Sequence, residues 1–186
     1  MSEYSNLVEI LQNRALKQAN HIAYRFLSDG KIESGNLTYE ELDRQARAIA
    51  AKLQSISKSG SRVLLVYPYH NGLEFISSFF GCLYAETIAV TTSPPRHGKE
   101  VIKLLERAIS SGSKVVLTTA EFLKTIKTGI ALDRELAKST QDFTFLATDT
   151  LPFSLSASWQ TPKIERDTLA FLQYTSGSTG IPKGVM

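Results

Sequence analysis

The sequence predicts an α/β fold in which helices flank a mostly parallel β-sheet. Helical and strand periodicities alternate along most of the 186 residues, which is typical of parallel-sheet proteins. Residues 63–67 read Val-Leu-Leu-Val-Tyr, an apolar run expected of a strand that is covered on both faces. Capping signals precede several helical segments. No internal repeat or interdomain linker is visible, so the length indicates one domain.

The first third of the chain predicts a helix followed by a hairpin. Asn6, with a glutamate three residues on, is an N-cap signal. The expected apolar face of this helix is Leu7, Ile10, Leu11 and Ala15. Residues 22–26 alternate apolar and polar side chains, as a strand does, and Asp-Gly at 29–30 favours a tight turn. Residues 32–37 are the expected return strand.

The second helix starts at a capping box made by Thr38 and Glu41. Its expected apolar face is Leu42, Ala46, Ile49, Ala50 and Leu53. After the strand at 63–67, Asn71 is expected to cap a third helix, and residues 87–90 form the next strand.

The remaining elements continue the alternation. Residues 99–111 predict a helix closed by Gly112. Its expected inward residues are Val101, Leu104, Leu105, Ala108 and Ile109. Residues 118–121 should cap another helix. The last expected strands are residues 114–118, 143–147 and 169–174, with a polar, proline-bearing loop at 148–162.

Composition narrows the class of protein. Hydrophobic residues make up 42% and charged residues 21% of the chain, as in ordinary globular proteins. The formal charge of +3 comes without a dense basic run, so no nucleic-acid partner is predicted. Cys82 is the single cysteine and lies in an apolar stretch, which predicts a buried thiol and a reducing compartment.

Targeting and metal-binding signals are not visible. The N-terminus has neither a basic nor an apolar signal region, and the most apolar window, residues 75–90, is too short to span a bilayer. We therefore expect a cytoplasmic protein without a membrane span. His21, His70 and His97 are widely spaced and show no metal-ligand pattern.

The run at 175–184, Thr-Ser-Gly-Ser-Thr-Gly-Ile-Pro-Lys-Gly, is the most informative segment of the chain. It holds three glycines, four hydroxyl side chains and one lysine, directly after an apolar strand. Backbone N–H groups in such a loop can turn inward around an anion, because glycine permits close approach. Lys183 adds a positive charge suited to phosphate. The segment predicts a loop for nucleotide phosphates.

Two other glycine-rich motifs do not fit this run. The P-loop of NTPases needs a hydroxyl residue after its lysine, where this chain has Gly184. The nucleophile elbow G-x-S-x-G needs glycine where Ser176 stands. A flexible serine-glycine turn would not require the fixed order of proline, lysine and glycine.

Every position from Thr175 to Gly184 satisfies [ST]-[ST]-G-[ST]-T-G-x-P-K-G, so the loop resembles the signature of the adenylate-forming (AMP-binding) enzymes. Residues 37–43, Leu-Thr-Tyr-Glu-Glu-Leu-Asp, resemble an opening helix found across that superfamily. Further segments resemble the fatty-acyl-AMP ligases in particular; they are residues 63–68, 79–85, 88–90, 94–96 and 172–174. Two positions depart from that family: Glu86 stands where glycine is usual, and Thr91 where proline is common.

The resemblance implies that a fatty carboxylate attacks the α-phosphate of ATP, with Mg²⁺, to give an acyl-adenylate and pyrophosphate. The acyl group would then pass to the phosphopantetheine arm of an acyl carrier protein. The residues that match the family's phosphate loop are Thr175, Ser176, Gly177, Ser178, Thr179, Gly180 and Lys183. Lys183 could instead support the loop through a carboxylate elsewhere.

The family's adenine site, ribose-binding aspartate and mobile C-terminal domain have no counterpart in residues 1–186. We therefore expect an inactive N-terminal fragment of the large domain, and assign no catalytic residue or metal ligand. An acyl-CoA synthetase, an amino-acid adenylation domain and a non-catalytic truncated protein remain alternatives. Residues 67–69 are expected to pack in the core, while the resemblance also allows them to line the acyl pocket. Residues 94–96 are expected to form a surface loop or to approach the substrate entrance.

Overall fold

The computed structural model describes residues 4–95, 98–165, 167–175 and 183–185. The elements, in chain order, are α1 (Leu7–Lys17), β1 (Ile22–Ser28), β2 (Ile32–Thr38), α2 (Tyr39–Ile56), β3 (Arg62–Leu65), α3 (Gly72–Tyr84), β4 (Ile88–Thr91), α4 (Gly98–Ser111), β5 (Val115–Thr118), α5 (Ala120–Ala131), α6 (Arg134–Ser139), β6 (Thr144–Ala147), the 3-10 helices η1 (Thr148–Thr150) and η2 (Phe153–Ser158), β7 (Phe171–Thr175) and β8 (Lys183–Val185).

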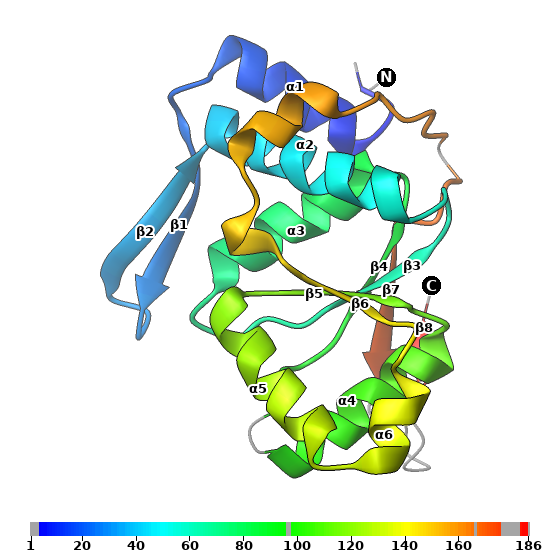
Figure 1. Cartoon of the computed structure of the whole chain (residues 1–186). Helices are drawn as coiled ribbons and strands as arrows, with labels where there is room; N and C mark the ends of the chain where they lie inside the picture. Colours follow the sequence, from blue (N-terminus) through cyan, green and yellow to red (C-terminus); the bar gives the residue numbers. More distant parts are fainter. Residues whose placement is uncertain (1–3, 96–97, 166, 176–182, 186) are drawn as a thin grey trace.

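A six-stranded sheet runs through the described part of the chain in the order β6-β5-β3-β4-β7-β8. The first five of these strands are parallel, and β8 is antiparallel to β7. Figure 1 shows α1, α2 and α3 on one side of this sheet and α4, α5 and α6 on the other. The β1–β2 hairpin forms a separate two-stranded sheet. The predicted α/β class with a mostly parallel sheet is therefore confirmed.

Alternating side chains of the central strand divide the interior into two cores. Val63 and Leu65 pack with residues of α1, α2 and α3, whereas Leu64 packs with residues of α4, α5 and α6. All three side chains are fully buried, as expected for a strand covered on both faces. Cys82 lies in the first core as a free, buried thiol, and burial raises its pKa to about 12. The predicted buried thiol is confirmed.

Two local signals give the structure that they predict. The backbone N–H of Glu41 donates to Thr38 Oγ1 at 3.2 Å, and the Thr38 N–H donates to Glu41 Oε2 at 2.9 Å, so the capping box of α2 is complete. At the hairpin turn, Asp29 and Gly30 have φ values of +51° and +70°. The Lys31 N–H donates to the carbonyl oxygen of Ser28 at 3.0 Å, so Asp29 and Gly30 are the central residues of a β-turn in which both have positive φ.

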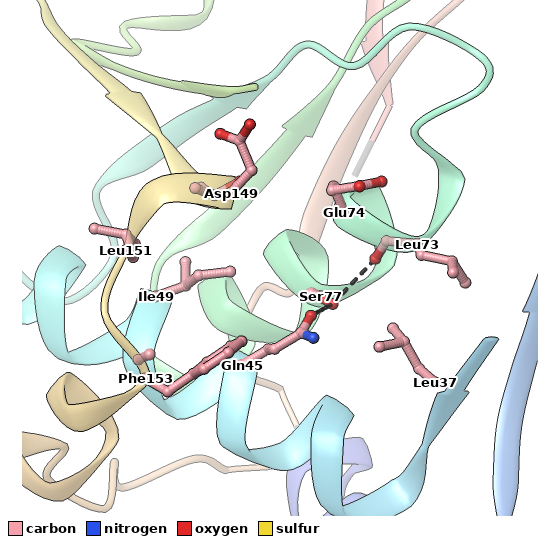
Figure 2. A pocket seen from close by; sticks show the side chains of 11 residues that line it. Leu37, Gln45, Ile49, Leu73, Glu74, Ser77, Asp149, Leu151 and Phe153 are labelled. Atoms are coloured by element: carbon pink, nitrogen blue, oxygen red, sulfur yellow. Dashed lines mark hydrogen bonds between the residues drawn. The ribbon is translucent and has the colours of Figure 1, made fainter. Parts of the chain in front are cut away.

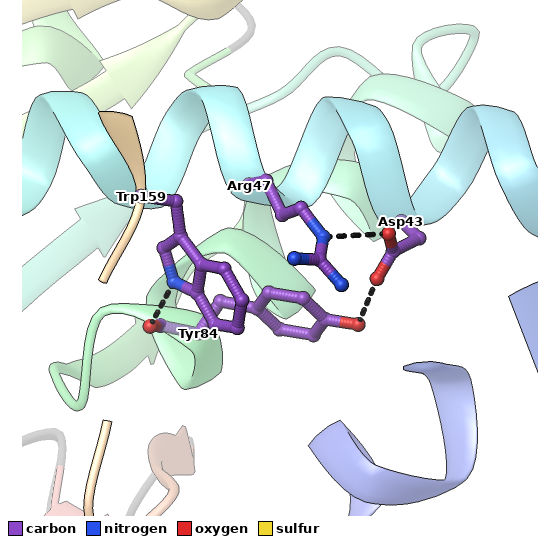
Figure 3. Close-up of polar contacts among 4 residues, drawn as sticks. All are labelled: Asp43, Arg47, Tyr84 and Trp159. Atoms are coloured by element: carbon purple, nitrogen blue, oxygen red, sulfur yellow. Dashed lines mark hydrogen bonds and ion pairs between the residues drawn. The ribbon is translucent and has the colours of Figure 1, made fainter. Parts of the chain in front are cut away.

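A cluster of four side chains fastens the segment after η2 to α2 and α3 (Figure 3). Trp159 Nε1 donates to the carbonyl oxygen of Tyr84 at 2.9 Å, and its ring lies under the guanidinium of Arg47, 4.3 Å from centroid to Cζ. Asp43 accepts from Arg47 Nε at 2.6 Å and from the Tyr84 hydroxyl at 2.7 Å. Burial raises the pKa of Tyr84, which therefore stays protonated as a donor.

Several details of the helices differ from the sequence-based predictions. In α1 the buried residues are Val8 and Leu11, while Leu7 is 51% exposed, because only one narrow row of this helix meets the core. Asn71 precedes α3 but makes no side-chain cap, since its backbone is not in the extended conformation that capping requires. Ile109, expected to point inward, is half exposed.

The second half contains elements that the sequence patterns did not predict. The cap of α5 is Thr119, whose Oγ1 accepts from the Phe122 N–H at 3.3 Å, whereas Thr118 remains in β5. The short helix α6 was not predicted. Residues 148–162, expected to form a loop, contain η1 and η2. Short 3-10 turns have no extended hydrophobic period, so pattern analysis misses them.

The end of α4 follows the usual helix-stop geometry. Gly112 has φ +72°, and its N–H donates to the carbonyl oxygen of Ile109 at 2.9 Å. The next N–H, from Ser113, donates to the carbonyl oxygen of Ala108 at 2.8 Å. This pair of bonds is a Schellman motif, in which glycine occupies the left-handed position.

The end of α3 has the same motif without glycine. Glu86 has φ +56°, and its N–H donates to the carbonyl oxygen of Leu83 at 3.1 Å. The Thr87 N–H reaches the carbonyl oxygen of Cys82 at 2.9 Å. A left-handed backbone at Glu86 gives a physical reason for the glycine that the family usually has there, because a side chain at this φ is strained.

We expect Glu86→Gly to raise the free energy of unfolding by about 0.5–1 kcal/mol, because relief of left-handed strain outweighs the entropy of a new glycine. Gly112→Ala at the equivalent position of α4 should lower it by about 1 kcal/mol. Urea unfolding of the 186-residue chain, followed by the fluorescence of its single tryptophan, measures both. A loss of stability in Glu86→Gly would contradict the assignment of strain.

Candidate functional site

The strands on either side of the expected phosphate loop, β7 and β8, form an antiparallel pair. In this pair, Thr175 lies opposite Lys183 and Tyr174 lies opposite Gly184. The structure thus places two of the predicted site residues, Thr175 and Lys183, opposite each other on neighbouring strands. The strand expected after Gly184 starts earlier, at Lys183. The predicted residues that lie outside the described part of the chain are Ser176, Gly177, Ser178, Thr179 and Gly180.

The sheet topology produces a crevice beside this loop. The chain leaves β3 into α3 on one face and leaves β4 into α4 on the other face (Figure 1). Where the connections of two neighbouring parallel strands leave toward opposite faces, a crevice forms beyond the carboxyl ends of the strands, and α/β proteins bind ligands there. Because β7 is parallel to β4 and adjacent to it, the loop after β7 begins at the same edge.

A cavity of about 330 Å³ lies at this edge. It is lined by Tyr67, Pro68, Tyr69, Gly72, Phe75, Thr91, Thr92, Ser93, Pro94, Gln173 and Tyr174. The lining combines aromatic rings with hydroxyl and amide groups. Three strands therefore contribute their last residues, or the residues just after them, to one site next to the expected phosphate loop.

Tyr67 is held in place by a buried hydroxyl network. Its hydroxyl lies 2.6 Å from Ser78 Oγ and 2.7 Å from Thr148 Oγ1, and Thr148 donates to the carbonyl oxygen of Thr118 at 3.3 Å. Burial raises the pKa of Tyr67, so the phenol stays neutral and serves as a structural hydrogen-bonding group. The network connects the carboxyl ends of β3 and β5 with α3 and η1.

The segment at 67–69 matches its prediction only in part. Tyr67 is buried, as expected, but Tyr69 is 68% exposed because it lies beyond the edge of the sheet. The expectation of core packing is wrong for Tyr69. Both tyrosines line the cavity.

The turn after β4 is more than a surface loop. Pro94 and Pro95 line a second cavity of about 280 Å³, which also contains Arg107 of α4. Arg107 Nη1 donates to Thr92 Oγ1 at 2.9 Å, and this bond fixes the residue that follows β4. Arg96, the third residue of the predicted turn, lies outside the described residues.

A further cavity of about 250 Å³ lies between α2, the start of α3 and η1 (Figure 2). Ser77 Oγ lies 2.6 Å from Gln45 Oε1 and 3.0 Å from the carbonyl oxygen of Leu73. Asp149, on the rim, accepts from the Ala120 N–H at 2.8 Å and so helps to start α5. Ser77, Gln45 and Asp149 of this cavity therefore support the fold.

Within residues 4–95, 98–165, 167–175 and 183–185, no group of three or more His, Cys, Asp or Glu side chains could hold a metal ion. His97 is not among these residues. The same part of the chain contains no helix long and apolar enough to cross a membrane.

Comparison with known proteins identifies the family. Residues 11–186 match the family model described as "AMP-binding enzyme". The chain belongs to this family.

The most similar curated relatives include fatty-acid ligases. The medium-chain-fatty-acid–[acyl-carrier-protein] ligase JamA of Moorena producens is 41% identical over 187 residues, which are 99% of this chain and 31% of JamA. The long-chain-fatty-acid–AMP ligase FadD32 of Mycobacterium marinum is 31% identical over 190 residues, covering 98% of this chain and 29% of FadD32. The resemblance to fatty-acyl-AMP ligases is confirmed.

A solved structure shows the same fold. The crystal structure of fatty acyl-adenylate ligase from L. pneumophila, in complex with acyl adenylate and pyrophosphate, superposes with a TM-score of 0.84 at 37% identity. The match covers 99% of this chain and 30% of that chain. The chain therefore spans about a third of the length of these relatives.

We expect Tyr67→Phe to lower the free energy of unfolding by about 0.5–1.5 kcal/mol, because Ser78 and Thr148 each lose a buried partner. Urea unfolding of the 186-residue chain tests this. Tyr24→Phe, which removes a hydroxyl from a half-exposed tyrosine of β1, is the control and should be nearly neutral. Equal effects of the two substitutions would show that the hydroxyl network contributes nothing.

Proposed function

We propose that the chain is the N-terminal fragment of an enzyme that activates a fatty acid with ATP, giving an acyl-adenylate and pyrophosphate. The main support is the pairing of β7 with β8, the strands on either side of residues 176–182, because β7 is one of the three parallel strands that line one cavity. The similarity to fatty-acid ligases over 99% of the chain, but only 31% of JamA, supports both the reaction and the assignment as a fragment.

In this reaction a carboxylate oxygen attacks the α-phosphorus of ATP. The bond between the α-phosphorus and the bridging oxygen breaks, and pyrophosphate leaves with the electron pair. Backbone N–H groups and hydroxyls of residues 175–180 would hold the β- and γ-phosphates, where negative charge develops. Lys183 would add a positive charge at the start of β8. The magnesium ion would arrive bound to the phosphates, since Mg²⁺ prefers phosphate oxygens and water.

The acceptor in the second step is proposed to be the phosphopantetheine thiol of an acyl carrier protein. The thiolate sulfur would attack the acyl carbonyl carbon, and AMP would leave with the oxygen that joined it to the acyl group. Support comes from JamA, which is a ligase for an acyl carrier protein and is 41% identical to this chain. The single unpaired cysteine is in keeping with a cytoplasmic protein, because thiols stay reduced there. The proposed products of the pathway are lipids, polyketides or lipopeptides.

Full-length protein is expected to catalyse ATP–pyrophosphate exchange that depends on a fatty acid, while residues 1–186 alone should be inactive. Isotope exchange into ATP measures this, with a panel of amino acids as the comparison. Exchange that depends on an amino acid would favour an amino-acid adenylation domain and refute the proposed substrate. Transfer to CoA, in place of a carrier protein, would identify an acyl-CoA synthetase.

Lys183→Ala should lower kcat/KM for ATP in the exchange reaction by about 100-fold, because a charge that stabilises the leaving pyrophosphate is lost. The matched control is Lys163→Ala, since Lys163 is 92% exposed and its only ion pair among the described residues is a 3.8 Å contact with Glu165. Thermal unfolding separates the alternative role. A Lys183→Ala protein that melts earlier with its exchange activity intact would make the lysine a structural support.

A further inference from the structure

The turn that follows β4 forms a wall shared by two cavities. The cavity of about 330 Å³ at the carboxyl edge of the sheet and the second cavity of about 280 Å³ are both lined by Tyr69, Ser93 and Pro94. Thr92 lines the first of these cavities, and Pro95 lines the second. The position of residues 92–95 therefore decides the shape of the candidate site on this side.

The backbone gives this turn little support. Pro94 and Pro95 have no N–H group, so neither can donate a backbone hydrogen bond. Within residues 4–95, 98–165, 167–175 and 183–185, no backbone–backbone hydrogen bond outside the helices and strands involves residues 92–95. The one hydrogen bond that joins the turn to the rest of these residues comes from a side chain: Arg107 Nη1 donates to Thr92 Oγ1 at 2.9 Å.

Arg107 belongs to a helix that is itself firmly held. The helix α4 packs on the sheet (Figure 1) through fully buried side chains, which include Leu104, Leu105 and Ala108. Arg107 precedes Ala108 and is partly buried. A planar guanidinium on a packed helix loses little further freedom when it forms a hydrogen bond. Arg107 can therefore hold a turn that the backbone leaves without support.

A second arginine makes a similar bond at the other edge of the sheet. Arg62 is the first residue of β3, and its Nη1 donates to the carbonyl oxygen of Ser111, the last residue of α4, at 2.7 Å. Arg62 lines neither of the two cavities. The two bonds are alike in type, and they differ in whether the residue that accepts the bond lines the candidate site.

We propose that Arg107 is a positioning residue of the adenylating site. By holding Thr92, it keeps the wall at residues 92–94 where that wall contacts a substrate. Arg107 acts through Thr92 and touches no reacting atom in this role. The inference rests on the proposed function, and it adds to that function a residue that lies outside the phosphate loop.

The test uses full-length protein carrying Arg107→Ala in the ATP–pyrophosphate exchange assay. The KM for ATP or for the fatty acid, whichever substrate meets the wall, should rise about tenfold, because the hydrogen bond that fixes the wall is lost. The value of kcat should change less than about threefold, since the wall contacts the substrate before and during the reaction. A variant that is only less stable would contain less active protein, which lowers the apparent kcat and leaves both KM values unchanged.

Three further variants test whether Arg107 acts through Thr92. Arg107→Lys keeps one donor on a long side chain, so KM should return to within about threefold of the parent value. Thr92→Val removes the acceptor at nearly constant size and should raise the same KM about tenfold. In the double variant Arg107→Ala/Thr92→Val, the rise should be no greater than in either single variant, because both substitutions remove the same bond.

Arg62→Ala is the matched control. It removes a hydrogen bond of the same type from the opposite edge of the sheet. The melting temperature of this variant should fall, while both KM values should stay within about twofold of the parent values, because the lost bond supports the end of α4 and not the site.

Two results would overturn the inference. Unchanged KM values in Arg107→Ala, with a lower melting temperature, would make the bond purely structural. Rises in KM that multiply in the double variant would show that Arg107 does not act through Thr92. If Arg107→Ala does not fold, Thr92→Val alone decides, and an unchanged KM there overturns the inference. Failure of the parent protein to show any exchange dependent on a fatty acid would instead refute the proposed function, and this inference with it.

Discussion

The site depends on one constraint of the sheet: β3 and β4 are parallel neighbours whose connections leave toward opposite faces. A parallel strand needs a crossover helix, and a sheet with helices on both faces must send some crossovers each way. Neither α3 nor α4 can cover the point between β3 and β4 at which the direction of the crossover connections changes. The cavity lined by Tyr67, Thr91 and Gln173 lies there, and the loop after Thr175 starts at its side.

Close contact between α2 and α3 is a second constraint with consequences for the site. Gly81 allows α2 to pack against α3 near Ile49, and Ser77 of α3 hydrogen-bonds to Gln45 of α2 in the same contact. The same helix provides Ser78 to the Tyr67 network and Phe75 to the cavity wall. The buried hydroxyl network holds Tyr67 at the end of β3 in a fixed position. The wall of the cavity at Tyr67 is therefore rigid.

Local signals in the sequence predicted local structure well. The capping box of Thr38 and Glu41 and the turn at 29–30 were confirmed, because hydrogen bonds and φ values within a few residues decide both features. Glu86 shows the other case. Its departure from the family's usual glycine was visible in the sequence, but the left-handed backbone that makes glycine favourable there was visible only in the structure.

The sequence also predicted where the loop residues lie along the chain, but not what surrounds them. Thr92, Arg107 and Phe75 were missed as neighbours of the site, although each lies at or near the end of an element that was predicted. The order of the strands in the sheet was not predictable either, because no short-range sequence pattern indicates that β7 pairs with β4.

The amino-acid sequence by itself determined the α/β class, the helix starts with complete caps, and the chemistry of the run at 175–184, because these depend on composition and short-range spacing. Only the tertiary structure decided that the end of β7 lines a cavity at the change of crossover direction, and that Phe79 meets Phe171. Those two rings are far apart in sequence, and the packing of α3 against the sheet alone brings them within 5.8 Å of each other.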